Sequence, residues 1–249
     1  MNVFWLEQTE PDLPAADDWL SVGELHVLRN MRFPKRRADW RLGRWAAKRA
    51  VTFCLGLPSG PEKLASLEIR AAASGEPEVI FCGRAAAVAI SISHRSGVAL
   101  CAVAPSGATL GCDLELIEPH SDAFTADYLA PEEQDLVLKS PSYDRALLVS
   151  LLWSAKESAL KALHQGLRLD TRSVLVDFPL PSCDSAGWSP LRVRYGRDSI
   201  YQGCWSRSGN FLRTIVAATS LHLIPIELKS TKTRNGYADS SQARESLHS

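Results

Sequence analysis

The longest periodic pattern of hydrophobic positions runs from Asp144 to Gln165 and repeats with the spacing of an α-helix. Its apolar residues fall at intervals of three and four, and Gly166 is well placed to end the helix. The stripe consists of Leu147, Leu148, Leu151, Leu152, Ala155, Ala159, Leu160 and Leu163. The pattern therefore predicts a long helix with one face in a hydrophobic core.

Three further helices are indicated by start signals and periodicity. Ser21 and Glu24 have the spacing of a capping box, and Pro131 suits the first turn of another helix. Pro34 interrupts the first of these helices. Residues 35–55 then combine a basic face with an apolar stripe, which contains Trp40, Leu42, Trp45, Ala46, Ala50 and Phe53. We therefore expect two helices early in each half of the chain.

Short β-rich runs, separated by Gly, Pro and Ser, fill the remainder. The predicted strands are Val3–Leu6, Leu67–Arg70, Val79–Cys82, Val88–Ser93, Val98–Ala104, Thr109–Leu116, Ser173–Asp177, Leu191–Tyr195, Ser199–Ser206 and Leu212–Thr219. The order of two helices followed by strands occurs twice, which predicts an α+β fold built from a duplicated unit, although no residue-level repeat accompanies it. We place subdomains at residues 1–108 and 109–226. The loss of hydrophobic periodicity beyond them predicts a disordered tail at 227–249.

Composition narrows the classes of function. The chain has 249 residues, of which 45% are hydrophobic, so it can bury an apolar core in one large or two small domains. Lysine plus arginine and aspartate plus glutamate both number 28, so no overall charge attracts nucleic acid or anionic lipid. No signal peptide or membrane-length apolar segment is evident. We expect a soluble cytoplasmic protein with neither nucleic acid nor membrane as a partner.

The six cysteines are scattered and lack the paired spacing of a zinc or redox site. Cys54, Cys101 and Cys112 lie in apolar runs, where a reduced thiol behaves as a small hydrophobic group. We therefore predict free thiols without a catalytic role.

Two acidic residues share one face of a predicted strand. Polar and apolar residues alternate from Thr109 to Leu116, so Asp113 and Glu115 project side by side, about 7 Å apart along the strand. Such carboxylates are suitable ligands for a Mg²⁺ ion that retains several waters. A solvated strand face without a metal would show the same pattern.

A charged pair lies on the long predicted helix. Glu157 and Lys161 have the favourable i,i+4 spacing and follow Trp153 by one and two turns. A helix-surface ion pair would look identical, and a tryptophan at this position is more often a core residue than a ligand contact.

Histidine and basic residues are the remaining candidates. Ser93 and His94 lie where a strand ends near a glycine, a place where a phosphate can approach the backbone, although a strand-end histidine is often purely structural. The basic helix face suits a multiply charged phosphate ligand or simply solvent. It carries Lys35, Arg36, Arg37, Arg41, Arg44 and Lys48.

The order of these motifs resembles the 4'-phosphopantetheinyl transferase superfamily. The basic helix containing Leu-Gly-Arg is followed by Ser-x-Ser-His, by Gly-Cys-Asp-Leu-Glu at 111–115, and by Trp-Ser-Ala-Lys-Glu-Ser-Ala-Leu-Lys at 153–161. The resemblance extends over residues 21–219. The length resembles the monomeric surfactin-type branch, which implies two α+β subdomains related by pseudo-twofold symmetry.

The resemblance implies a Mg²⁺-dependent enzyme that moves the phosphopantetheine arm of coenzyme A onto a serine of an apo acyl or peptidyl carrier protein. Metal binding is implied for Asp113, Glu115 and Glu157, and catalysis for Glu157, as base, and for Lys161. Coenzyme A binding is implied for Arg44, Ser93, His94 and Lys161. We expect the carrier to dock by charge complementarity near the junction of the halves, between residues 119 and 142.

One residue departs from the family pattern. Glu76, in Gly-Glu-Pro, occupies a position where a lysine or arginine usually contacts phosphate. The departure implies weaker coenzyme A binding or a substitute among Arg70, Arg84 and Arg95. Two other functions compete with transfer: a non-catalytic coenzyme A-binding or carrier-docking protein of the same fold, and a Mg²⁺-dependent phosphohydrolase. The carrier pathway does not follow from the sequence.

Overall fold

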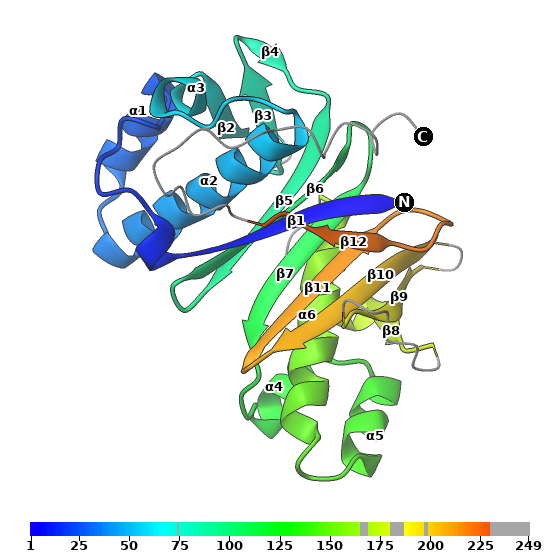
Figure 1. The fold of residues 1–249 in the computed structure, drawn as a ribbon. Coiled ribbons are helices and arrows are strands. Elements are labelled where there is room, and N and C mark those ends of the chain that lie inside the picture. The colour runs from blue at the N-terminus through cyan, green and yellow to red at the C-terminus, as the bar shows by residue number, and fades with distance from the viewer. Residues whose placement is uncertain (74, 165–168, 180–186, 197–198, 230–249) are drawn as a thin grey trace.

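The computed structural model describes residues 1–73, 75–164, 169–179, 187–196 and 199–229. It has an α+β fold in which two halves lie against each other along neighbouring strands (Figure 1). The predicted fold class is therefore confirmed. Among the described residues, no helix combines the length and the apolar character needed to cross a bilayer.

In the N-terminal half, strands pack against a long basic helix. The elements are β1 (Asn2–Thr9), α1 (Val22–Asn30), α2 (Pro34–Cys54), α3 (Pro61–Ala65), β2 (Leu67–Ala71), β3 (Pro77–Phe81), β4 (Arg84–Ala85), β5 (Val88–Arg95) and β6 (Val98–Pro105). One sheet has the order β12-β1-β6-β5 and another the order β2-β3-β4. Helix α2 begins at Pro34, whose missing N–H costs nothing in a first turn, and it buries Leu42, Ala46 and Ala50 against the strands.

The C-terminal half repeats this arrangement around a second long helix. Its elements are β7 (Leu110–Leu116), α4 (Asp122–Tyr128), α5 (Pro131–Lys139), α6 (Arg145–Ala162), β8 (Val174–Asp177), β9 (Ser189–Tyr195), β10 (Ser199–Ser208) and β11 (Phe211–Ala217). The sheet has the order β7-β11-β10-β9-β8. In both halves the first strand therefore pairs with the last strand of that half, as β1 with β6 and β7 with β11.

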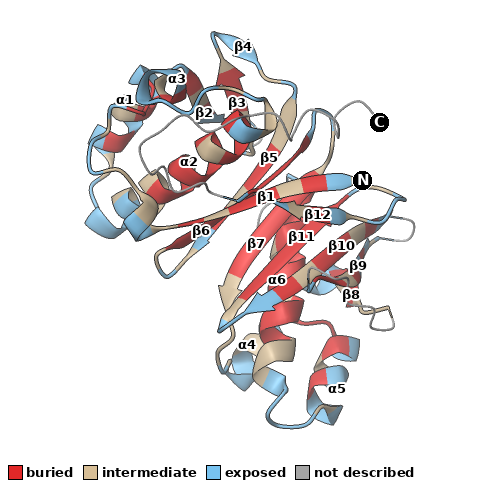
Figure 2. Cartoon of the chain, viewed as in Figure 1, coloured by how far each residue is buried: buried red, intermediate tan, exposed pale blue. Residues whose placement is uncertain are grey.

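The halves are joined by a shared hydrophobic core. Val3, Leu100 and Ala102 from the first half pack with Cys112 and Ile215 from the second. Figure 2 shows that buried residues line the strands and the inner faces of α2 and α6, while exposed residues gather on the outer helices. The residues of this shared core are thus buried like those of the two separate cores. Polar groups at the junction must therefore find partners within the protein.

The predicted strands and long helices all occur, with boundaries shifted by a few residues. The sequence pattern missed α3, α4 and the two-residue strand β4, which are too short for a clear period. The predicted end of the long helix at Gly166 lies outside the described residues, and α6 ends at Ala162.

A last strand, β12 (Ile224–Glu227), was also missed. It pairs in parallel with β1 and so adds the end of the second half to the first sheet. Glu227 belongs to this strand and Leu228 is buried in the N-terminal core, although both fell within the predicted tail. Residues 230–249 of that tail lie outside the described residues.

Candidate active site

Asp113 lies at the centre of a buried polar cluster at the junction of the halves. It sits on β7 opposite Thr214 of β11, and its carboxylate is almost completely buried. Ser93 of β5 donates a hydrogen bond to Asp113 Oδ1 at 2.8 Å, and Ser154 of α6 donates to Oδ2 at 2.9 Å. Lys161 Nζ lies 2.8 Å from Oδ1. The cluster therefore joins a strand from each half with α6.

Lys161 pairs with Asp113, and no ion pair between Lys161 and Glu157 is found among the described residues. The i,i+4 surface pair considered from the sequence is thus wrong as a description of Lys161. Its ammonium also donates to Ser93 Oγ at 3.2 Å and to the Cys112 carbonyl at 3.0 Å. Burial lowers the pKa of Lys161, but Asp113, Cys112 and Glu157 together outweigh this effect and the pKa is raised. Lys161 is therefore a fixed cation.

A network of hydroxyl groups supports Asp113 from behind and was missed in the sequence. The hydroxyls of Ser154 and Thr214 lie 2.9 Å apart, and those of Ser158 and Thr214 lie 2.7 Å apart. All three residues are fully buried or nearly so. The sequence does indicate that two of these hydroxyls share a helix face, because Ser154 and Ser158 are one helical turn apart on α6. This network fixes the orientation of the Asp113 carboxylate.

The other two predicted metal ligands lie beside this cluster. Glu115 accepts a hydrogen bond from Trp153 Nε1 at 3.3 Å and lies 3.4 Å from Arg95 Nε. Burial raises the pKa of Glu115, as does the neighbouring Asp113 charge, while Arg95 opposes the shift. Burial likewise raises the pKa of Glu157, against the effect of Lys161.

Glu157 Oε1 is buried without a hydrogen-bond partner. An unpartnered buried carboxylate oxygen is costly unless a ligand completes it. Within the described part of the chain, no group of three or more acidic, histidine or cysteine residues is arranged closely enough to hold a metal ion. The oxygen ligands of the three carboxylates suit a hard cation chemically, but in this arrangement they are not gathered around one point, and Asp113 is engaged by Lys161 and two serines.

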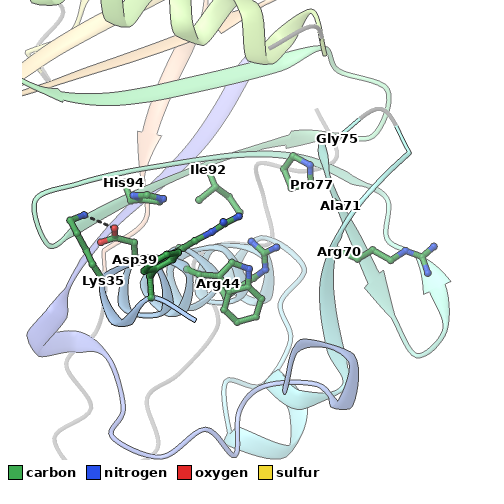
Figure 3. A pocket seen from close by; sticks show the side chains of 13 residues that line it. Lys35, Asp39, Arg44, Arg70, Ala71, Gly75, Pro77, Ile92 and His94 are labelled. Carbon is green, nitrogen blue, oxygen red and sulfur yellow. Dashed lines mark hydrogen bonds and ion pairs between the residues drawn. The ribbon is translucent and has the colours of Figure 1, made fainter. Parts of the chain in front are cut away.

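A cationic cavity of about 660 Å³ lies beside the cluster, between α2 and the strands of the first half (Figure 3). Arg44, Trp40 and His94 are among its walls, with Lys35 and Asp39 paired at one side. The remaining lining residues are Phe33, Arg36, Gly43, Arg70, Ala71, Gly75, Pro77 and Ile92. Its size falls within the range of about 300–1,000 Å³ that is usual for small-molecule sites.

Arg44 and His94 therefore share the cavity, whereas Ser93 points into the Asp113 cluster. The Arg44 guanidinium stacks on Trp40 at 4.7 Å, and its Nε is buried without a hydrogen-bond partner. Burial lowers the pKa of Arg44, and Glu24 partly opposes this effect. Two members of the predicted basic face have other roles, since Arg41 pairs with Asp17 and Lys48 is fully buried.

Two comparisons with known proteins give matches to 4'-phosphopantetheinyl transferases. Residues 109–216 match the model of the 4'-phosphopantetheinyl transferase superfamily. The matched region covers less than half of the 249 residues. The chain is also 28% identical over 164 residues to the 4'-phosphopantetheinyl transferase HetI of Nostoc sp., an alignment that covers 65% of this chain and 67% of that protein.

Solved holo-[acyl-carrier-protein] synthases show weaker, local similarity. The Thermotoga maritima protein matches with 18% identity and a TM-score of 0.35, over 43% of this chain and 61% of that chain. The Bacillus anthracis protein, solved in complex with CoA (3',5'-ADP), matches with 23% identity and a TM-score of 0.35, over 41% of this chain and 91% of that chain. These likenesses cover less than half of the chain and do not decide its overall fold.

The matched region contains Asp113, Glu115, Glu157 and Lys161, whereas the cavity residues lie outside it. Glu76, the residue that departs from the superfamily pattern, lies 3.2 Å from His164 Nδ1, just beyond the end of α6. Its neighbours Gly75 and Pro77 line the cavity.

Of the three suggested substitutes for a basic residue at position 76, Arg70 lines the cavity and pairs with Glu78. Arg95 pairs with Glu115 and Glu118 near the carboxylates. Arg84 lies on β4, away from this cavity.

Proposed function

We propose that this protein is a holo-carrier-protein synthase that transfers 4'-phosphopantetheine from coenzyme A to a serine of an apo acyl or peptidyl carrier protein. The observation that carries the proposal is the partly buried contact between Lys161 and Asp113 beside a cationic cavity, in a chain whose residues 109–216 match the model of the 4'-phosphopantetheinyl transferase superfamily. For the transfer, coenzyme A and the carrier serine would meet at the junction, to which both halves contribute side chains.

Coenzyme A binding is assigned to the cavity. The anionic groups of coenzyme A are matched by Arg44, Lys35 and Arg36. The flat rings of Trp40 and His94 offer surfaces for its nucleotide base. Lys161 Nζ donates to Ser93 Oγ at 3.2 Å, and Ser93 is adjacent in β5 to His94, which lines the cavity. Lys161 would therefore contact the pyrophosphate at the reacting end of coenzyme A.

In the reaction, the carrier serine oxygen forms a bond to the β-phosphorus as the bond to the 3',5'-ADP oxygen breaks. The serine proton passes to a base, and 3',5'-ADP leaves with the bonding electrons. Glu157 is the proposed base because burial raises its pKa and leaves Oε1 free to accept a hydrogen bond. Lys161 stabilises charge that builds on the phosphoryl oxygens.

A Mg²⁺ ion is part of the proposal. Asp113, Glu115 and Glu157 would hold it, since hard oxygen ligands suit this ion and each carboxylate is held in a buried or half-buried position. When bound, the ion supplies Lewis-acid stabilisation of phosphoryl oxygens. The position of Lys161 on Asp113 means that the carboxylates must rearrange to bind a metal.

Further features of the surfactin-type branch are also proposed. Both halves have the same order of first, last and penultimate strands, which supports a pseudo-twofold arrangement. Because one chain contributes both sides of the junction, we propose that it acts as a monomer, and that it works in the cytoplasm. Size-exclusion chromatography with light scattering tests the monomer, and a dimer mass would overturn it.

Carrier docking needs a different location from the one expected. Residues 119–142 contain five acidic side chains and one lysine, so this segment does not complement an acidic carrier helix. The start of α2 carries Lys35, Arg36 and Arg37 beside the exposed Phe33 and is the better electrostatic match. Charge reversal of Arg37 should raise the carrier KM and leave coenzyme A binding unchanged; an unchanged carrier KM would contradict this location.

Mass spectrometry of apo carrier proteins incubated with the protein, coenzyme A and Mg²⁺ tests the function. We expect the mass increase of one phosphopantetheine group, and its loss with Asp113→Ala. Coenzyme A binding without transfer to several acyl and peptidyl carriers would favour a non-catalytic binding protein. Release of 3',5'-ADP without a carrier would indicate a phosphohydrolase.

A further inference from the structure

The N-terminal half contains a buried lysine–glutamate pair. Lys48 Nζ lies 2.5 Å from Glu24 and donates to the carbonyl oxygens of Trp19 and Leu64, each at 2.9 Å. Glu24 Oε1 accepts the backbone N–H of Ile69 at 3.1 Å, which ties α1 to β2. The Lys48 and Glu24 side chains have exposed fractions of 0% and 2%. The Glu24 carboxylate is therefore fixed in place by backbone groups.

The C-terminal half contains a second pair with the same contacts. Lys156 Nζ lies 2.7 Å from Glu133 and donates to the carbonyl oxygens of Thr171 and Val174. Glu133 Oε1 accepts the backbone N–H of Val176 at 3.0 Å, which ties α5 to β8. Each lysine ends a short motif, Trp-Ala-Ala-Lys in α2 and Trp-Ser-Ala-Lys in α6. The halves thus share a residue-level repeat that the sequence analysis did not detect.

The two pairs differ in the residue one helical turn before the lysine. One helical turn before Lys48, Arg44 places its Nε 4.0 Å from Glu24 Oε1. The corresponding position before Lys156 is Leu152, which is fully buried and apolar. In the first half, one carboxylate therefore faces two cations, and the surplus positive charge belongs to a guanidinium that lines the cavity.

We infer that Glu24 is a positioning residue for Arg44 in anion binding, an inference that rests on the proposed coenzyme A site. Glu24 is held by the backbone N–H groups of Ser21, the N-cap of α1, and of Ile69 in β2, and so acts as a rigid reference point. Its charge attracts Arg44 from one side while the Trp40 ring covers a face of the guanidinium. The remaining N–H groups of Arg44 are thereby directed to a ligand in the cavity.

The test compares Glu24→Gln with Glu133→Gln, which removes the same charge from the pair that lacks an arginine. Both variants should lower the melting temperature by similar amounts, because each leaves a buried lysine without its carboxylate. Titration calorimetry with coenzyme A, well below both melting temperatures, should give a Kd about tenfold higher for Glu24→Gln, equivalent to about 1.4 kcal/mol. Glu133→Gln should stay within about twofold of the wild type.

A double-mutant cycle separates positioning from general destabilisation. In an Arg44→Ala background, Glu24→Gln should change the coenzyme A Kd by less than about twofold, since the arginine that Glu24 positions is absent. If Glu24→Gln does not fold, Glu24→Asp keeps the charge, retracts the carboxylate and should still weaken binding severalfold. An unchanged or lower Kd for the Glu24 variants, or equal weakening by Glu133→Gln, overturns the inference. Absence of coenzyme A binding by the wild type would instead overturn the proposed function.

Discussion

Lys161 Nζ lies 2.8 Å from Asp113 Oδ1, so the last turn of α6 is bound to β7 by a partly buried ion pair. The Asp113 side chain is only 5% exposed, whereas that of Lys161 is 29% exposed. A carboxylate as buried as that of Asp113 is strongly destabilising when its cationic partner is removed. The pair is therefore expected to matter both for stability and for the handling of phosphate at the junction.

Lys161→Met is expected to destabilise the protein by about 2 kcal/mol, because it leaves the Asp113 carboxylate without a cation. Adding Asp113→Asn removes the stranded charge and should recover more than half of the loss. Urea unfolding of the single and double variants measures both effects. Lys139→Met serves as control, since its contact with Asp135 is exposed and should be worth less than about 1 kcal/mol. A double variant no more stable than Lys161→Met would contradict this account.

Gly111→Ala is expected to destabilise the protein by about 3 kcal/mol. A Cβ at this position would lie 1.8 Å from the Ser158 carbonyl oxygen and 2.7 Å from the Ala162 nitrogen, and neither backbone atom can move freely. Gly60→Ala is the control, since no atom lies within 4 Å of its Cβ and the change should stay within about 1 kcal/mol. Equal melting temperatures for the two variants would show that α6 can shift away from β7.

Coenzyme A affinity is expected to rise as the pH falls below about 6.5, the ordinary pKa of histidine. Burial lowers the pKa of His94, Asp39 opposes the shift, and Lys161 and Lys35 add to it, so the imidazole is neutral at pH 7. Protonation at lower pH adds a positive charge beside the cavity and favours an anionic ligand. In the unliganded protein, the lowered pKa means that the same protonation costs stability.

The measurement is the Kd for coenzyme A across this pH range in wild type and in His94→Gln. The difference between the two proteins removes the titration of coenzyme A itself. A constant difference at all pH values would show that the charge of His94 does not contribute to binding.

The buried thiols are expected to resist alkylation. Burial raises the pKa of Cys112 to about 11 and that of Cys54 to about 12, so neither forms much thiolate at neutral pH. Among the cysteines that the structure describes, Cys82 is exposed and should react with iodoacetamide first. Peptide mapping after brief treatment near pH 8 measures the order. Rapid modification of Cys112 in the folded protein would contradict its burial at the junction.

The sequence by itself predicted most of the fold because the long helices and most strands have clear hydrophobic periods. It also placed Asp113 and Glu115 on one strand face, since side chains two residues apart always share a face. The family motifs identified Glu157 and Lys161 as candidates, and both lie on α6 beside the junction. Their roles in metal binding and catalysis remain predictions.

The choice of partners was decided by the tertiary structure. Lys161 could pair with Glu157 within its own helix for a few tenths of a kcal/mol, but the buried Asp113 needs a cation far more. In the same way, β12 joins β1 across more than 200 residues, and Glu24 meets Ile69 and Lys48 from separate elements. A local pattern records only the period of its own segment. Which buried charges and strand edges meet depends on how the two halves pack, because burial is what makes an unpaired group costly.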